Sequence, residues 1–223
     1  SVLMKNTSIF ALAAGMGSLV FATGATADVS VALVSQGDSA YGAGHVYQLV
    51  VTGLSDGDRI DAVYGNADAV LNIEATSSFY QNMFGNETSL GVNPALLAVF
   101  PSLADDSFVT IGSMNNVGNN LNTIGIDFSG FEGGGGLTTD NGSWFVTPDD
   151  AQGAAVDGQV IIGQFTVVGG TGVVADDFAS AIVSVQGTVG GSLYNGVGLN
   201  AIPAPGALAL LGVAGLVSRR RRK

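Results

Sequence analysis

The chain has 223 residues, with 18 carboxylates against seven lysines and arginines, one histidine and no cysteine. All 18 carboxylates lie within residues 28–202, where Arg59 is the one cation, so this stretch has a formal charge of −17. Without cysteine or lysine the stretch offers no disulfide framework, thiolate zinc site, Schiff-base lysine or Walker-type nucleotide site, and its charge excludes a nucleic-acid binder.

The first 27 residues have the order of charge and apolar residues that is typical of a secretory signal peptide. Lys5 lies in a short positive region, a long apolar run follows, and small residues precede residue 28. We expect signal peptidase to recognise Ala25 and Ala27 and to cleave before residue 28. Residues 1–3 precede the methionine that we expect to be the initiator.

Glycine content and alternation predict a strand-rich domain over residues 28–189. The 28 glycines of residues 28–202 exclude long helices and favour short strands joined by turns. In Val29–Leu33 and in Ile124–Phe128 one parity is apolar and the other is small or polar, as in a sheet with one buried face. The expected strands are 29–35, 46–52, 59–64, 69–74, 108–112, 123–128, 143–146, 160–168 and 181–189, of which 160–168 is long enough to be central.

Residues 93–100 are the one segment with a helical signal. Asn93 is a plausible cap, Pro94 suits the first turn and Pro101 ends the helix. One short helix among many strands predicts an all-β fold, a single antiparallel β-sandwich of the Ig-like or jelly-roll-like kind. We expect an N-terminal signal helix and a C-terminal membrane helix to flank it, and residues 190–202 to form a flexible spacer.

Three motifs resemble catalytic or nucleotide-binding patterns but lack the required context. Gly53–Gly57 matches a nucleophile elbow around Ser55, but a strand is expected to follow where the elbow needs a helix, so we interpret it as a hairpin turn. Segments 170–175 and 196–201 match the dinucleotide fingerprint without a βαβ unit. His45, the one imidazole, opens a strand and has no partner that the sequence identifies. We therefore expect no catalytic residue and no enzyme.

Acidic turns offer a candidate metal site. Asp56, Asp58 and Asp61 place three hard oxygen ligands within six residues, which suits a structural calcium ion. No segment has the complete calcium-loop pattern, and aspartate is also a common turn residue, so a turn without metal is the alternative.

Aromatic residues offer a candidate carbohydrate-binding platform. Tyr80 and Trp144 are large rings with amide side chains nearby in the sequence. A two-sheet fold usually buries such rings between its sheets, so we favour core packing over sugar binding.

The end of the chain combines a proline motif, an apolar run and a basic cluster. Pro203, Ala204 and Pro205 precede 13 uncharged residues, and then come Arg219, Arg220, Arg221, Arg222 and Lys223. As a helix the run would rise only ~20 Å against a hydrocarbon core of ~30 Å. A short span becomes feasible if it starts at Ala201 and the basic stems snorkel, with the cluster on the cytoplasmic side.

This tail, residues 202–223, resembles the PEP-CTERM sorting signal of Gram-negative bacteria, in the variant common in planctomycete-type proteomes. Ala204 stands where the name-giving tripeptide has glutamate. The resemblance implies export through the inner membrane, transient anchoring by the tail, and recognition near Pro203–Pro205 by the membrane-embedded enzyme exosortase. It also implies delivery to the cell surface or to an exopolysaccharide matrix, as in a biofilm.

We therefore expect a non-enzymatic, exported surface or matrix protein with a structural or adhesive role. A carbohydrate-binding module of the same matrix is the nearest alternative, and a secreted hydrolase that uses a pair of carboxylates is a more distant one.

Overall fold

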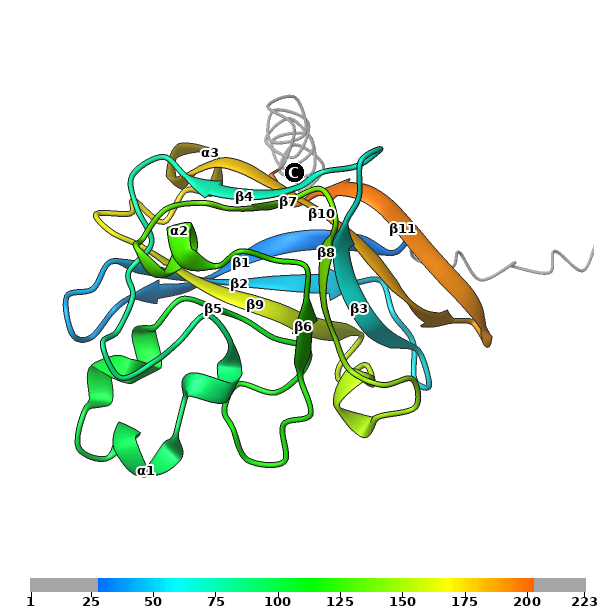
Figure 1. Ribbon diagram of the computed structural model, residues 1–223, viewed down its shortest axis with the longest axis horizontal. Helices are drawn as coiled ribbons and strands as arrows, with labels where there is room; N and C mark the ends of the chain where they lie inside the picture. The colour runs from blue at the N-terminus through cyan, green and yellow to red at the C-terminus, as the bar shows by residue number, and fades with distance from the viewer. Residues whose placement is uncertain (1–27, 203–223) are drawn as a thin grey trace, which may run out of the picture.

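The computed structural model describes residues 28–202, which form mostly antiparallel β-structure, as predicted (Figure 1). The expected signal peptide with Ala25 and Ala27, and the sorting tail with Pro203–Pro205 and Arg219–Lys223, lie outside the described residues. None of the helical segments of residues 28–202 has the length and hydropathy of a membrane-spanning helix.

Eleven strands and six short helical segments make up the described part. The strands are β1 (Ser30–Asp38), β2 (His45–Thr52), β3 (Arg59–Gly65), β4 (Leu71–Ala75), β5 (Phe108–Val109), β6 (Asn122–Ile124), β7 (Leu137–Thr139), β8 (Gly142–Phe145), β9 (Gln159–Val167), β10 (Phe178–Val189) and β11 (Ser192–Asn200). The helical segments are η1 (Ser89–Gly91), α1 (Pro94–Leu97), η2 (Pro101–Asp105), α2 (Ser129–Glu132), η3 (Ala151–Gly153) and α3 (Val174–Asp177).

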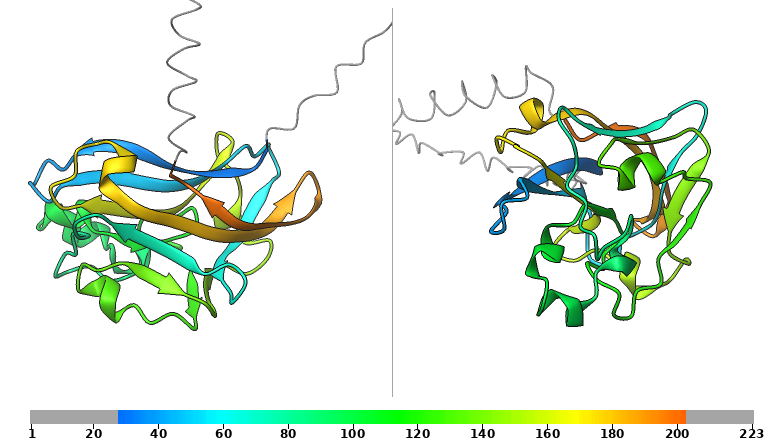
Figure 2. Two further views of the ribbon diagram at one scale, coloured as in Figure 1. Left: turned by 90° about the horizontal axis from the view of Figure 1, so that it is seen from above. Right: turned by 60° about the vertical axis from the view of Figure 1, so that its left-hand side comes forward.

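The strands form two sheets. The first has the order β1-β2-β9-β5, so β9 is interior, as its length predicts. The second has the order β6-β8-β3-β10-β4-β7. Strand β10 pairs with β11 along one side, and on the other side it pairs first with β4 and then with β3. The edge strands β1 and β11 contact each other, so the two sheets approach along this side of the body (Figure 2).

Both sheets contribute to one hydrophobic core. Leu33, Leu49 and Phe165 of the first sheet belong to the same buried cluster as Ile73 and Val183 of the second. The strand alternation predicted for Val29–Leu33 is confirmed, because Val31 and Leu33 are buried. This shared cluster holds the strands of the two sheets in fixed positions relative to one another.

The alternation over Ile124–Phe128 is misleading. Strand β6 ends at Ile124, whose side chain is 65% exposed, and Gly125 follows with φ = +71°. That positive φ turns the chain out of the strand, so the apolar parity does not continue on one buried face.

The helix predicted from Asn93 is present but shorter. The Asn93 side chain accepts a hydrogen bond from the backbone N–H of Ala95, and Pro94 is the first residue of α1. The helix ends at Leu97 and not at Phe100. The expectation of a single helix is wrong, since α2 and α3 are also present in the described part.

The expectation of a flexible spacer at residues 190–202 is wrong. Gly190 and Gly191 have φ values of +58° and +74° and form a two-residue turn between β10 and β11. Ala201 is buried, and its N–H donates to the carbonyl of Ala181. The folded body therefore extends beyond residue 189 and continues to Ala201.

Candidate functional site

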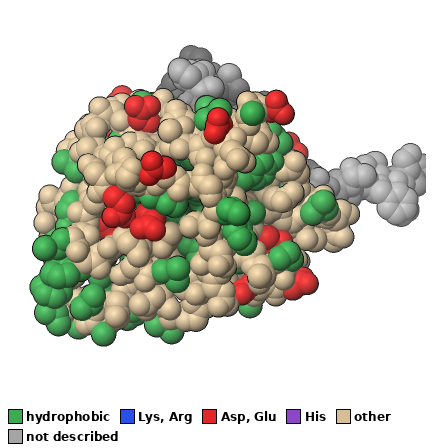
Figure 3. All heavy atoms as spheres, viewed as in Figure 1, with side chains coloured by type: hydrophobic (Ala, Val, Ile, Leu, Met, Phe, Trp, Pro, Cys, Tyr) green, Lys and Arg blue, Asp and Glu red, His purple; other side chains and the backbone are tan. Residues whose placement is uncertain are grey.

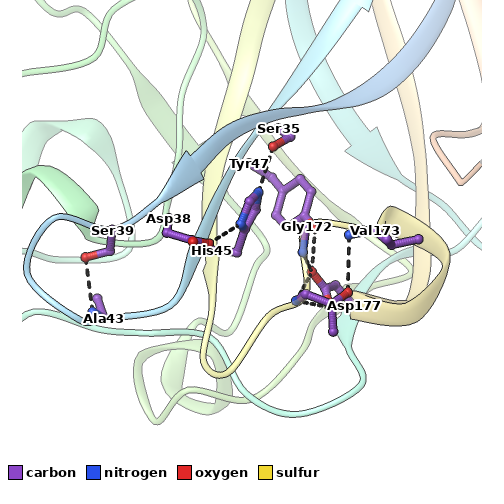
Figure 4. A network of polar contacts seen from close by, with 10 residues as sticks. Ser35, Asp38, Ser39, Ala43, His45, Tyr47, Gly172, Val173 and Asp177 are labelled. Carbon is purple, nitrogen blue, oxygen red and sulfur yellow. Dashed lines mark hydrogen bonds and ion pairs between the residues drawn. The ribbon is translucent and has the colours of Figure 1, made fainter.

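A hydrogen-bonded serine, histidine and aspartate meet at one end of the β1–β2 pair (Figure 4). The two ring nitrogens of His45 contact Ser35 Oγ and Asp38 Oδ1, each at 2.7 Å. His45 is 7% exposed, whereas Ser35 and Asp38 are exposed. The expectation that His45 lacks positioned partners is therefore wrong.

A β-bulge in β1 gathers these three side chains on one face. Ser35 pairs with Tyr47, but after Gln36 the register shifts, so that Asp38 pairs with His45. Directly paired residues share a face, and His45 and Tyr47 share a face because they are two positions apart. In a regular strand Ser35 and Asp38 would point to opposite faces, so the extra residue places both beside the imidazole.

The partners of His45 fix the tautomer of its neutral ring. A carboxylate only accepts hydrogen bonds, so Nδ1–H must donate to Asp38 Oδ1. In the neutral imidazole Nε2 then carries the lone pair and accepts the hydrogen bond that Ser35 Oγ–H donates. The arrangement is one in which the serine hydroxyl proton already points at a base.

A second carboxylate, which unlike Asp38 is buried, holds the loop that lies against His45. Asp177 is 2% exposed and accepts hydrogen bonds from the Tyr47 hydroxyl, from the N–H and hydroxyl of Thr171, and from the N–H of Gly172. Gly172 lies so close to the His45 ring that a Cβ there would come within 3.0 Å of it. The Tyr47 ring also packs against the His45 ring, with centroids 4.9 Å apart. Together these contacts hold the imidazole in place.

Burial and hydrogen bonding set the protonation states of Asp177 and Tyr47. Burial opposes ionisation of Asp177, but the hydrogen bonds from Tyr47, Thr171 and Gly172 outweigh it and keep the pKa of Asp177 below its ordinary value. Burial, together with the bond to the Asp177 carboxylate, raises the pKa of Tyr47. The phenol therefore stays a donor and Asp177 stays an acceptor at neutral pH.

We expect Gly37→Ala to disturb the bulge that forms the site. Gly37 has φ = +101°, a conformation that an L side chain adopts only with strain, although nothing lies within 4 Å of a Cβ there. The free energy of unfolding should fall by about 1–2 kcal/mol. The measurement is chemical denaturation beside Gly130→Ala, whose Cβ also meets nothing but whose φ is not positive. Equal stability of the two variants would show that the bulge does not depend on glycine.

The three candidate calcium ligands do not converge. Asp58 is buried, and its two oxygens accept backbone N–H bonds from Ser55 and Gly190, both at 2.7 Å. Asp61 binds Arg59 at 2.6 Å, and Asp56 is exposed. No group of three acidic or imidazole side chains that could hold a metal occurs in residues 28–202. The calcium prediction is wrong there, because Asp58 and Asp61 already serve turns and an ion pair.

The candidate carbohydrate platform is also not formed by the predicted rings. Trp144 is fully buried, and its indole N–H donates to the carbonyl of Thr110. Tyr80 is half-buried, and its hydroxyl accepts a bond from Asn82. Phe84 and Phe100 are partly exposed, but they stack on each other with centroids 4.0 Å apart. Trp144 and Tyr80 therefore present no row of exposed rings to a sugar.

The elbow-like motif around Ser55 connects the two sheets. β2 lies in the first sheet and β3 in the second, so the segment is a crossing and not the hairpin turn that we expected. The N–H of Ser55 donates to Asp58, and the strand β3 follows. The context of a nucleophile elbow is therefore missing, as predicted.

A cavity of about 700 Å³ lies at the opposite end of β2 and β9 from His45, near Gln159 and Ile161. Its polar side chains already have partners: Gln152 Oε1 accepts a hydrogen bond from the backbone N–H of Asn120, and the side-chain amide of Asn120 donates to Asp150. The backbone N–H of Gln152 and the Asn120 side chain lower the pKa of Asp150. A glycosidase acid needs the reverse shift, so Asp150 does not provide it.

Comparison of the chain with protein-family models, with curated proteins and with solved structures found no match. The chemistry of the His45 site therefore has to follow from its own geometry. One signal in the sequence could have located the site, because Gly37 lies two residues after the expected strand 29–35 and a glycine there can mark a bulge. Ser35 and Asp38 were missed because a register shift is not visible in the pattern of apolar residues. Asp177 was missed because its contact with Tyr47 joins residues 130 positions apart.

Proposed function

We propose that this chain is an exported protein of the cell surface or extracellular matrix, sorted by an exosortase-type system, with a structural or adhesive role. The support is the order of the sequence: a signal-peptide pattern over residues 1–27, an acidic β-body, and a tail over residues 203–223 that resembles a PEP-CTERM signal. Signal peptidase, exosortase and the inner membrane are the partners that this order implies.

The body that we propose as cargo is a β-sandwich of the Ig-like or jelly-roll-like kind. Its two antiparallel sheets share one core, which supports this description. Acidic side chains lie at several separate places on the face in Figure 3. A net formal charge of −17 over residues 28–202 keeps such a body soluble and well hydrated, which suits a matrix.

The observation that carries the proposal is the position at which the last described strand pairing ends. The N–H of Ala201 completes the pairing beside Ala181, two residues before Pro203. The segment that resembles a sorting signal therefore begins directly after the last described strand, which is the position expected of a terminal signal.

We expect deletion of Pro203–Lys223 to leave the body folded and to abolish delivery to the surface. The measurement compares the melting temperature of the purified protein and its distribution among periplasm, membrane and surface fractions. A matched variant that keeps the tail but replaces Arg219–Lys223 by glutamine separates the basic cluster from the proline motif. Surface delivery without the tail, or unfolding on its removal, would contradict the proposal.

A further inference from the structure

The Ser35–His45–Asp38 relay has the geometry that activates a serine nucleophile. A base must lie within hydrogen-bonding distance of the hydroxyl, and a third group must orient the base. Both conditions are met at 2.7 Å, and the imidazole is buried while the serine is exposed. Nothing in the exported structural role requires this arrangement.

The residues around His45 favour a role in proton transfer over an incidental contact between His45 and Ser35. The bulge after Ser35 is what brings two partners to one imidazole. The loop at Gly172 and the ring of Tyr47 pack against that imidazole, and Asp177 anchors both. A histidine with this support keeps its orientation while a proton moves, which is the condition for general-base catalysis.

We propose that Ser35 is the nucleophile of an acyl-transfer site that hydrolyses short, uncharged acyl esters such as acetyl esters. This activity goes beyond the structural role and departs from the expectation of a body without catalysis.

The site limits the substrate in two ways. Ser35 lies on the exposed end of β1, and the cavity of about 700 Å³ lies at the other end of the sheet, so this cavity does not receive the acyl group of an ester at Ser35. The formal charge of −17 over residues 28–202 disfavours anionic esters by repulsion. Short neutral esters on an exposed substrate meet both conditions.

The reaction balances without a cofactor. Ser35 Oγ bonds to the ester carbonyl carbon while its proton passes to His45 Nε2. The ester C–O bond then breaks, and His45 returns the proton to the leaving alcohol. Water, deprotonated by His45, attacks the acyl-serine, and the carboxylic acid and the free Ser35 hydroxyl are released. Asp38 holds the imidazole in the required tautomer throughout.

The test labels the full-length protein with a fluorophosphonate and maps the label by peptide mass spectrometry. An activated serine oxygen attacks the phosphorus of this probe, so an O–P bond forms, the P–F bond breaks and fluoride leaves. We expect labelling at Ser35, and hydrolysis of p-nitrophenyl acetate that falls at least ~100-fold in Ser35→Ala and in His45→Gln. Ser30→Ala is the matched control, since Ser30 is on the same strand but bonds to the neutral hydroxyl of Thr52. This control should leave both readouts unchanged.

The labelling and hydrolysis experiments can each contradict the proposed role of Ser35. Absence of label, a label on another residue, or hydrolysis that persists in Ser35→Ala would overturn the proposal. If His45→Gln does not fold by thermal melting, the exposed Asp38→Asn variant replaces it, and a Ser35 labelling rate that this variant leaves unchanged would also overturn the proposal. Failure here leaves the sorting proposal intact, because sorting depends on residues 203–223.

Discussion

Replacing Asp177 by alanine is expected to lower the free energy of unfolding by about 3 kcal/mol, or the melting temperature by about 10 °C. The substitution leaves the Tyr47 hydroxyl and the N–H groups of Thr171 and Gly172 without their shared acceptor. The Tyr47 hydroxyl is fully buried, and an unsatisfied buried donor costs more than the lost bond itself. The loop against His45 should then loosen, and fluorophosphonate labelling of Ser35 should fall with it.

Asp176→Ala is the matched control for this prediction. Asp176 is the preceding residue, has the same charge and is exposed, so its loss should change stability by less than about 0.5 kcal/mol. The pKa of Asp177 is depressed in the folded protein, so its stabilisation is present above the ordinary carboxyl pKa and is lost as the pH falls. The deficit of Asp177→Ala should therefore shrink in acid. Equal effects of the two substitutions would contradict the buried network.

Asp106→Asn is expected to stabilise the protein at alkaline pH. Asp106 is fully buried and accepts a bond from the N–H of Asn82 through Oδ1, while Oδ2 has no partner in the described part. Burial raises the pKa of Asp106 from 3.8 to about 7, against backbone hydrogen bonds that lower it. At pH 8 the wild type therefore holds a buried charge that the amide removes, and the variant should be more stable by about 1–3 kcal/mol.

The stability that Asp106 contributes changes with pH in the opposite direction to the stability that Asp177 contributes. A carboxyl whose pKa is raised in the folded state stabilises the fold below its unfolded pKa, and this stabilisation is lost as the pH rises from 3.8 to about 7. Thermal melts between pH 4 and pH 9 should show the gap between variant and wild type opening over that range. Asp140→Asn removes the same charge from an exposed position and should show no such gap. A variant that is less stable at pH 8 than the wild type would contradict the raised pKa.

Much of the first sheet could be predicted from residue alternation. Val31 and Leu33 point to the core as their parity indicates, and β9 is interior as its length indicates. Strand β11 was missed because Leu193 and Val197 are exposed, so the segment lacks an apolar face. The turn signal Gly190–Gly191 was present, and two glycines between strand-like runs are typical of a tight hairpin.

The candidate site depends on contacts that no single segment contains. Asp177 and Tyr47 are 130 positions apart in the chain, and Gly172, which lies against His45, belongs to the same distant segment as Asp177. The calcium prediction at Asp56–Asp61 failed for the opposite reason. These carboxylates are close in sequence, but the fold does not bring them together. Arg59 and the N–H of Gly190 already satisfy two of them.

The most direct test of the account is mass spectrometry of both termini of the protein recovered from surface and matrix fractions of cells that produce it. We expect a mature N-terminus at Asp28 and a C-terminus processed near Pro203–Pro205. Recovery of the chain in the cytoplasm with residues 1–27 and 203–223 intact would contradict it.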